Sequence, residues 1–228
     1  MSGDHNASPF NAVPPVVVAL ALVMFGVEIL FEAGARGFIG GPEAVGWRLN
    51  AIRDHAFFGS VFRYMMETGQ FPLSEMARFV TYPFLHLGFT HLLLVLVFLL
   101  ALGKMVGEVF GTWAFLVVFF GAAIIGALVF ALLTSANTPL LGGYPAVYGL
   151  IGAFTFILWV RLGQAGAPQY RAFSLIAILL LVQLVFGLLF GSGLDWVAEV
   201  AGFVAGFLLS FVVSPGGWHH VRERLRQR

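Results

Sequence analysis

Six long apolar runs, separated by Gly-, Pro- or polar-rich stretches, are the feature that most constrains this chain of 228 residues. A helix needs about 20 mostly apolar residues to cross the hydrocarbon core of a bilayer. The chain is 60% hydrophobic and 10% charged, whereas soluble domains average about 45–50% and about 25%, so the excess apolar surface must face lipid. We expect six spans, at about Pro15–Phe31, Thr90–Val106, Thr112–Leu133, Ala146–Val160, Ala172–Phe190 and Trp196–Val213.

Charge and cysteine content exclude several other classes of protein. The 12 Lys and Arg residues nearly balance the 11 Asp and Glu residues, which leaves a formal charge of +1. The chain therefore has no dominant basic stripe, and we expect no nucleic-acid partner. With 0 Cys, it has no disulfide framework, no thiol nucleophile and no cysteine metal site. We expect the lipid bilayer as a partner and no cofactor.

The loop between the first and second spans is about 55 residues long and rich in aromatic residues. It is too long and too apolar for a plain linker. Apolar side chains recur there at helical spacing, at Phe58, Val61, Phe62 and Met65, while Arg63 and Glu67 take another face. This pattern predicts a short helix that lies in the headgroup region of the membrane.

The basic residues of the short loops predict the orientation of the chain. Lys104 follows the second span, Arg161 and Arg171 follow the fourth, and the tail carries Arg222, Arg224, Arg226 and Arg228. Because basic short loops stay in the cytoplasm, we expect both termini there, in a bacterial cytoplasmic membrane. The expected organisation is a cytoplasmic segment at 1–14, a six-helix membrane domain at 15–213 with its first loop at about 34–88, and a basic tail at 214–228.

Polar side chains inside spans are costly, at about 2.5–3.5 kcal/mol for a mid-helix charge on insertion scales, and are therefore informative. The candidates in this chain are Glu28, Glu32, His86, His91, Tyr144, Tyr148, Gln183, Asp195 and Glu199. Small residues mark close helix packing, and two such pairs stand out, Gly149 with Gly152 and Gly202 with Gly206. We interpret these glycines as helix-packing positions within the molecule, with dimerisation as the alternative.

Four segments together resemble one known family. They are RFVTYPFLHLGFTHLLLV at 78–95, the Leu102-Gly103 pair followed by Glu108 and Gly111, GGYPAVYGLIG at 142–152, and AEVAGFVAG at 198–206. In this order they are similar to the first loop and second helix, the turn between the second and third helices, the fourth helix, and the sixth helix of rhomboid intramembrane serine proteases. The resemblance covers roughly residues 78–213. It implies an all-α polytopic membrane protein, a six-helix bundle with a large membrane-associated first loop.

The positions that carry the family's chemistry differ in this chain. The resemblance places the nucleophilic serine at Tyr144, the general-base histidine at Glu199 and the oxyanion-side asparagine at Val95. Only His91, on the oxyanion side, is retained. A shift of one residue places Pro145 at the serine position and restores no nucleophile. Because a serine needs a positioned base, and one oxyanion donor is worth about 10²–10³ in rate, we expect a protein without protease activity.

Three arrangements of the remaining polar residues are open from the sequence. Tyr144 and Glu199 form a hydrogen bond in place of the serine and histidine, or Glu199 is a polar partner for a helix of another protein, or Glu199 pairs with His91. A metal site of His86, His91 and Glu199 is disfavoured, because a spacing of five residues is poor for one helical face. Glu28 and Glu32 are expected to pair with loop arginines, and Gln183 to bond between helices.

The leading functional hypothesis is a rhomboid-like protein that binds transmembrane segments of other proteins without cleaving them. The candidate polar cluster for this role is His86, His91, Tyr144, Tyr148 and Glu199. One alternative is an active intramembrane serine endopeptidase, which would need a serine outside the motif, such as Ser135, Ser174, Ser192 or Ser210. The other alternative is a structural subunit of a larger membrane complex.

Overall fold

The computed structural model describes residues 13–135, 138–190 and 193–214, and within these ranges the protein is helical and has no strand. An isolated antiparallel bridge joins Phe57 to Leu140. The long helices are α1 (Pro15–Ala35), α5 (Phe89–Leu133), α6 (Tyr144–Gln164), α7 (Ser174–Phe190) and α8 (Trp196–Val213). The short ones are η1 (Pro42–Gly46), α2 (Trp47–His55), α3 (Gly59–Thr68), α4 (Leu73–Thr81), η2 (Tyr82–Phe84) and η3 (Gln169–Phe173). The expected all-α polytopic fold is confirmed.

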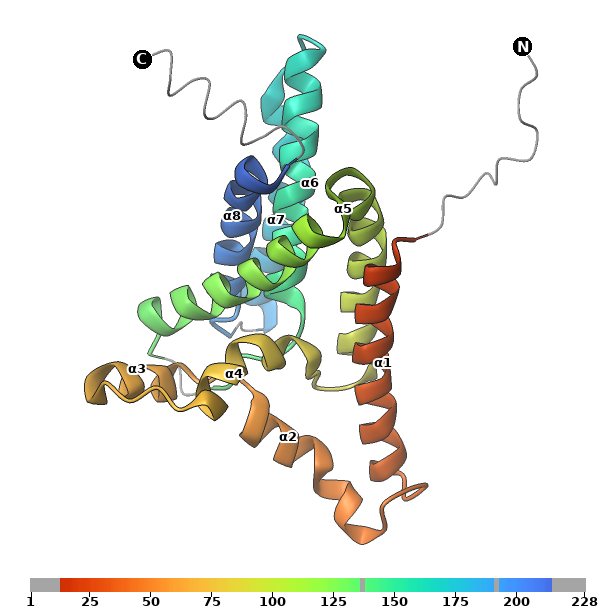
Figure 1. Ribbon diagram of the computed structural model, residues 1–228, viewed down its shortest axis with the longest axis vertical. Coiled ribbons are helices and arrows are strands. Elements are labelled where there is room, and N and C mark those ends of the chain that lie inside the picture. The colour runs from red at the N-terminus through yellow and green to blue at the C-terminus, as the bar shows by residue number, and fades with distance from the viewer. Residues whose placement is uncertain (1–12, 136–137, 191–192, 215–228) are drawn as a thin grey trace, which may run out of the picture.

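The six expected spans lie in five long helices, because α5 contains two of them. Its 45 residues correspond to about 68 Å at 1.5 Å per residue, against about 30 Å for the hydrocarbon core. Within α5 the backbone of Gly111 has φ 76° and ψ 174°, a conformation that favours glycine. Figure 1 shows the resulting sharp bend near the end of the molecule opposite α2, after which the chain runs back as a second pass.

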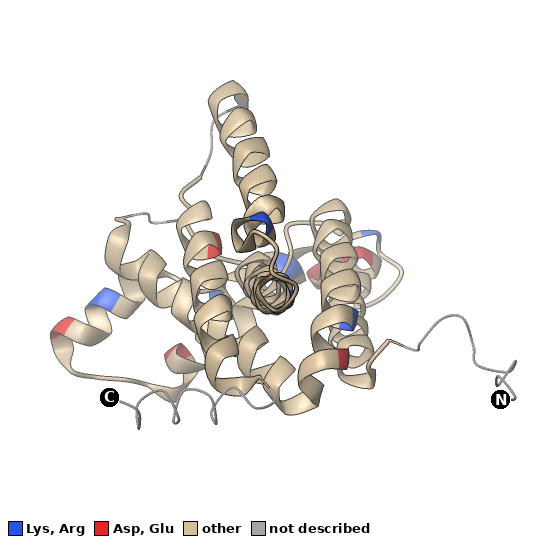
Figure 2. Cartoon of the chain, turned by 90° about the horizontal axis from the view of Figure 1, so that it is seen from above, with Lys and Arg blue, Asp and Glu red and all other residues tan. Residues whose placement is uncertain are grey.

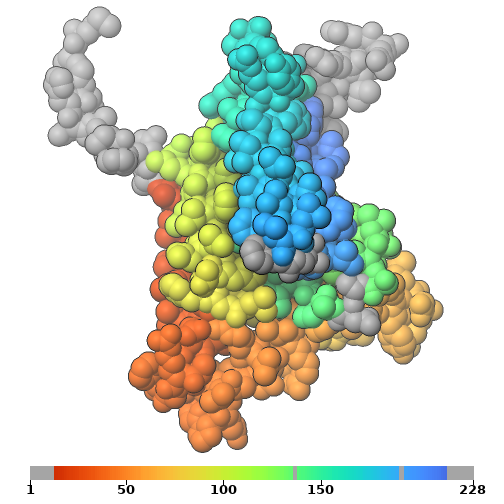
Figure 3. Space-filling model, turned by 180° about the vertical axis from the view of Figure 1, so that it is seen from behind, coloured from red at the N-terminus to blue at the C-terminus, as the bar shows by residue number. Residues whose placement is uncertain are grey.

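Helix α6 packs against both α5 and α8, which also pack against each other, so the three helices form the core of the bundle (Figure 1). In its most apolar 18-residue window 61% of the residues are buried inside the protein, against 17% for α1 and 11% for the segment that contains α7. The apolar surface of α1 and α7 therefore faces lipid. The space-filling view in Figure 3 shows α7, in light blue, on the outside of the bundle.

Glycines allow α6 and α8 to approach closely. A Cβ atom added to Gly206 would lie 2.0 Å from the carbonyl oxygen of Gly149, and one added to Gly202 would lie 2.2 Å from that of Pro145. A Cβ on Gly152 would lie 2.2 Å from the carbonyl oxygen of Phe203. These contacts involve backbone atoms, which cannot rotate away, so all of these glycines serve packing within the molecule.

The first loop forms three short α-helices, where the sequence pattern predicts one. The predicted helix is α3, in which Phe62 and Met65 are buried. Phe62 packs edge-to-face on Phe79 of α4, at 5.6 Å between ring centroids. Arg63, expected on a separate polar face, donates hydrogen bonds of 2.9 Å and 2.8 Å to the carbonyl oxygens of Ala131 and Thr134. It thereby satisfies free carbonyls at the end of α5 and fixes the loop to the bundle.

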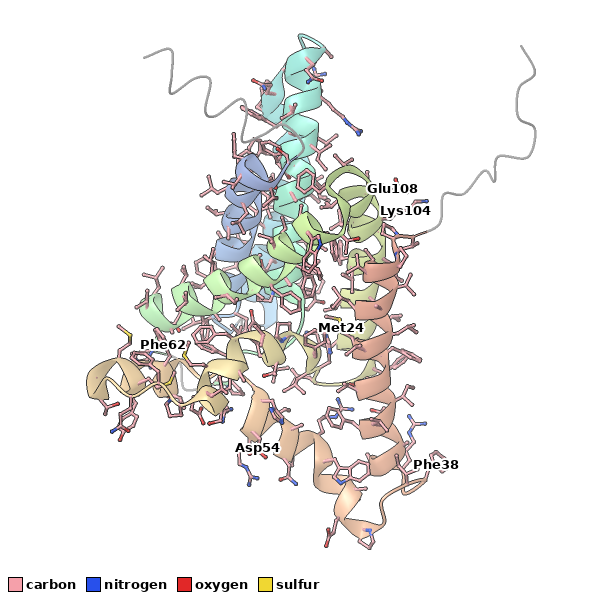
Figure 4. All side chains as sticks on the ribbon, in the orientation of Figure 1. Met24, Phe38, Asp54, Phe62, Lys104 and Glu108 are labelled. Atoms are coloured by element: carbon pink, nitrogen blue, oxygen red, sulfur yellow. The ribbon has the colours of Figure 1, made fainter. Side chains whose placement is uncertain are left out.

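Charged residues are few and gather towards the ends of the molecule. Figure 2 shows the long helices tan over most of their length. Lys104 and Glu108 lie near the bend of α5, at the end opposite Asp54 and Phe38 of the first loop (Figure 4). The basic tail at 214–228 and the segment at 1–14 fall almost wholly outside the described residues.

Candidate functional site

His91 of α5 and Tyr144 of α6 meet at the end of the bundle that lies next to the first loop. Their rings stack with 5.2 Å between centroids and an interplanar angle of 22°. The backbone N–H of Leu87 donates to Nδ1 of His91 at 3.3 Å, so the proton of the neutral ring sits on Nε2. Gly142, with φ 95°, is needed beside this ring because a Cβ there would lie 2.7 Å from Cε1 of His91.

Val95 lies one turn after His91 on α5 and is fully buried. Its Cγ1 atom would lie 2.7 Å from a Cβ added to Gly143, the residue before Tyr144. The three positions His91, Val95 and Tyr144 are thus neighbours in space. An isopropyl group has no hydrogen-bonding atom, so Val95 gives this site an apolar wall.

Glu199, in the first turn of α8, is 8% exposed. Its Oε2 accepts a hydrogen bond of 2.5 Å from Nε2 of Gln183, a residue of α7. Tyr144 interacts electrostatically with the same carboxyl group, and the hydroxyl of Tyr148 interacts with it both electrostatically and through a side-chain hydrogen bond. In the part of the chain that the structure describes, no hydrogen bond joins Glu199 to Tyr144 or to His91, two of the three arrangements left open by the sequence, and the carboxyl contacts Gln183 and Tyr148 instead. The expectation that Gln183 bonds between helices is confirmed.

His86 precedes α5 and lies just outside the membrane-spanning segments. It is 1% exposed, and among the described groups neither ring nitrogen makes a hydrogen bond of normal geometry. Its ring meets that of His91 edge-on, with 5.2 Å between centroids. Burial, and next the neighbouring His91, lower the pKa of His86 to about 3. The ring is therefore neutral at physiological pH.

Arg48 of α2 holds both glutamates of α1, as expected for the loop arginines. Its guanidinium makes two hydrogen bonds to Glu28, of 2.8 Å and 2.9 Å, and one of 3.0 Å to Glu32. It also donates to the carbonyl oxygen of His86 at 2.7 Å. One side chain thus joins α1, the first loop and the segment that leads into His91. The sequence offers five arginines in this loop and no signal that selects Arg48.

The three residues weighed as metal ligands, His86, His91 and Glu199, do not form one cluster. Within 13–135, 138–190 and 193–214 no three His, Cys, Asp or Glu side chains lie close enough together to hold an ion. His86 and His91 are adjacent because His86 lies before the helix, yet Glu199 is engaged by Gln183.

Of the alternative serines, Ser210 donates to the carbonyl oxygen of Gly206 at 2.7 Å, and Ser192 lies outside the described residues.

The fold and the site define a polytopic helical membrane protein whose fourth and sixth apolar segments meet at glycines. Its site residues His86, His91 and Tyr144 lie together at the end that carries the helical first loop. The rhomboid domain matches residues 73–216. The chain belongs to the rhomboid family.

Curated relatives agree with this assignment. The chain is 34% identical over 138 residues to Rhomboid-like protease 3 of Toxoplasma gondii, covering 59% of this chain and 51% of the relative. It is 32% identical over 143 residues to Putative rhomboid protease YdcA of Bacillus subtilis, covering 60% and 67%. It is 33% identical over 131 residues to Inactive RHOMBOID-like protein 8 of Arabidopsis thaliana, covering 58% and 36%. The match to the Toxoplasma protein spans about half of that relative's length.

Proposed function

We propose that this protein is a rhomboid without protease activity that binds transmembrane segments of other proteins. The observation that carries the proposal is the set of side chains at the site: Tyr144 at the family's serine position, Glu199 at its histidine position and Val95 at its asparagine position. Tyr144 stacks on His91, which the resemblance assigns to the oxyanion side, and Val95 lies one turn after His91 on α5. Glu199 interacts electrostatically with Tyr144.

The chemistry of acyl transfer argues against activity. A nucleophilic hydroxyl needs a base within hydrogen-bond reach. Tyr144 carries its hydroxyl much further from the backbone than a serine does, and its ring stacks on His91 face to face at 22°. Glu199 is held by Gln183. Among the described hydrogen bonds, none joins a serine to a histidine.

Binding of other helices is supported by the small area over which α7 packs against the rest of the protein. Only 11% of the segment that contains α7 is buried inside the protein, and α7 shares few contacts with α6. Transmembrane helices associate through van der Waals packing and interhelical hydrogen bonds. A helix of another protein can therefore compete for the surface that α7 covers.

A second candidate, an active serine endopeptidase, is favoured by the names of two relatives, a rhomboid-like protease and a putative rhomboid protease. The relative from Arabidopsis named as inactive favours the first proposal. A third candidate, a structural subunit of a larger membrane complex, is distinguished from the first by its partners. It requires one partner in fixed stoichiometry.

The experiment is reconstitution of the full chain in liposomes with a panel of labelled single-span proteins, followed by affinity purification and gel analysis. The proposal expects several single-span proteins to be retained at full length. It expects Tyr144→Ala to change their retention, and the matched control Leu22→Ala, on the 63% exposed lipid side of α1, to leave it unchanged. Fragments cut within the membrane would contradict the proposal, as would the retention of one stoichiometric partner alone.

We also propose that the protein lies in a bacterial cytoplasmic membrane with both termini in the cytoplasm. Lys104, near the bend of α5, and Arg161, near the end of α6, lie at the same end of the molecule, opposite the first loop (Figure 1, Figure 4). This is the distribution that the positive-inside rule associates with a cytoplasmic face.

A further inference from the structure

The bond between Gln183 and Glu199 joins two helices that otherwise have little contact. Glu199 is 8% exposed and sits in the first turn of α8, whereas Gln183 lies in the middle of α7. The residues that flank Gln183 on α7 point outward: Leu181 is 59% exposed and Leu184 is 59% exposed. The hydrogen bond is therefore the specific polar contact that positions the middle of α7.

Glu199 also lacks a basic partner in the described part of the protein. The arginines of the first loop are engaged elsewhere, with Glu28, Glu32, Asp54 and Glu75. Asp195, one turn earlier, adds a second negative group at the same end of α8 and interacts electrostatically with Glu199. The amide of Gln183 donates a hydrogen bond but brings no positive charge. The two carboxyl groups thus form an acidic pair without a basic partner among the described residues.

The depth of Glu199 suits a basic side chain of another helix. Glu199 is three residues into α8, which places it about 5 Å from the start of that helix at 1.5 Å per residue. This end of the bundle is the one that carries the first loop (Figure 1). A Lys or Arg close to the membrane surface extends its charged end toward water at low cost, and an ionised donor makes a stronger hydrogen bond to a carboxylate than a neutral amide does.

We infer that Glu199 is the recognition residue for transmembrane helices that carry a Lys or Arg near the membrane surface on the side of the first loop, and that Gln183 occupies this carboxyl until such a helix displaces it. The inference rests on the proposed function, the binding of transmembrane segments, and names the class of segment. The exchange replaces one hydrogen bond by another and breaks no covalent bond. It moves α7 away from α8 and uses the same carboxyl oxygen.

The test uses the full chain in lipid nanodiscs and a designed apolar single-span helix labelled for energy-transfer measurement. Three versions of the helix are compared. The first carries Lys at the depth of Glu199, near the membrane surface on the side of the first loop. The second carries Leu at the same position, and the third carries Lys near the opposite membrane surface. The first is expected to bind about 3- to 20-fold more tightly than the other two, the range of measured interhelical hydrogen bonds in membranes.

Protein variants identify the residues responsible. Gln183→Leu removes the internal competitor and is expected to tighten binding of the Lys helix while leaving the Leu helix unchanged. The matched control Val182→Leu, at the neighbouring 49% exposed position of α7, is expected to change neither. Glu199→Gln keeps the shape of the side chain but loses its charge, and is expected to abolish the preference for Lys.

The outcomes separate the two proposals. Equal binding of all three helices by the unmodified protein would overturn the inference and leave the proposed function standing. Binding of none of them, together with no retention of single-span proteins in the reconstitution described above, would overturn both. A preference for Lys that survives Glu199→Gln in a folded variant would also overturn the inference.

Discussion

Arg48 and Glu28 form a buried bidentate ion pair, with the two guanidinium nitrogens of Arg48 at 2.8 Å and 2.9 Å from the two carboxylate oxygens of Glu28. The side chain of Glu28 is 1% exposed and that of Arg48 is 19% exposed. Since Arg48 also donates to the carbonyl oxygen of His86, this pair connects α1 to the segment that positions His91. The first loop is in this way part of the structural support of the site.

Loss of Arg48 should destabilise the protein strongly. Arg48→Ala leaves the carboxyl of Glu28 buried without its partner, a change that costs about 3–5 kcal/mol for buried pairs. We expect a clearly lower midpoint of thermal unfolding for the detergent-solubilised variant. The control is Arg36→Ala, because Arg36 is 68% exposed in its pair with Glu32 and exposed pairs contribute about 0–1 kcal/mol. Equal effects of the two substitutions would contradict the assigned role of Arg48.

Close packing of α6 on α8 gives a second prediction. In Gly206→Ala the new methyl group would lie 2.0 Å from the carbonyl oxygen of Gly149, so the helices must separate, at a cost of about 1–3 kcal/mol for overpacking. The matched control is Gly26→Ala on α1, where the added Cβ meets nothing within 4 Å. This control should be neutral or stabilising by up to about 1 kcal/mol, because alanine is the better helix former.

The two glycine variants are compared by unfolding in denaturant, followed by circular dichroism in one detergent. Gly206→Ala should unfold at a lower denaturant concentration than the unmodified protein, and Gly26→Ala should not. If Gly206→Ala unfolds at the same denaturant concentration as the unmodified protein, then the approach of the two helices is not as close as described.

The neutral, buried His86 predicts acid sensitivity. Its pKa is lowered from 6.5 to about 3 in the folded protein, so between these values the unfolded chain binds a proton that the folded chain does not. The stabilising contribution is fully present above about pH 6.5 and is lost as the pH falls towards 3. At about pH 5 the loss amounts to about 2 kcal/mol, from 1.36 kcal/mol per pH unit.

The measurement is thermal unfolding at about pH 7.5 and about pH 5, for the unmodified protein and for His86→Leu. The difference in unfolding temperature between the two pH values should be much smaller in His86→Leu than in the unmodified protein. His55→Leu, at an exposed position of α2, should keep it. A pH difference that is unchanged in His86→Leu would show that another group is responsible.

Much of the fold follows from the sequence because the forces that set it are local. Apolar length alone locates the spans, and the spacing of Gly202 and Gly206 indicates a close helix contact. Gly111 is a signal of the same kind: the sequence pattern predicts one span on either side of it, and the structure has two helical passes that meet at a kink there. Hydrophobic periodicity locates both passes but does not report that they meet at a kink without an intervening loop.

The polar contacts of the site could not be chosen from the sequence. The sequence leaves Tyr144, His91 and a helix of another protein open as partners for Glu199, whereas the folded bundle brings Gln183 to it. Likewise, the long first loop brings Arg48 to Glu28 and Arg63 to Ala131, pairings that depend on how three loop helices fold over the bundle. Side-chain partners separated widely along the chain are set by tertiary structure, which residue spacing does not encode.

The central claim, a rhomboid without proteolytic chemistry, is tested most directly by labelling the purified protein with a serine-directed fluorophosphonate and measuring cleavage of a model transmembrane substrate in bilayers. The same measurement is made on the triple variant Tyr144→Ser, Val95→Asn, Glu199→His. We expect no labelling and no cleavage by the unmodified protein, and detectable cleavage by the variant. Labelling and cleavage by the unmodified protein would contradict it and would place a nucleophilic serine outside the positions assigned above.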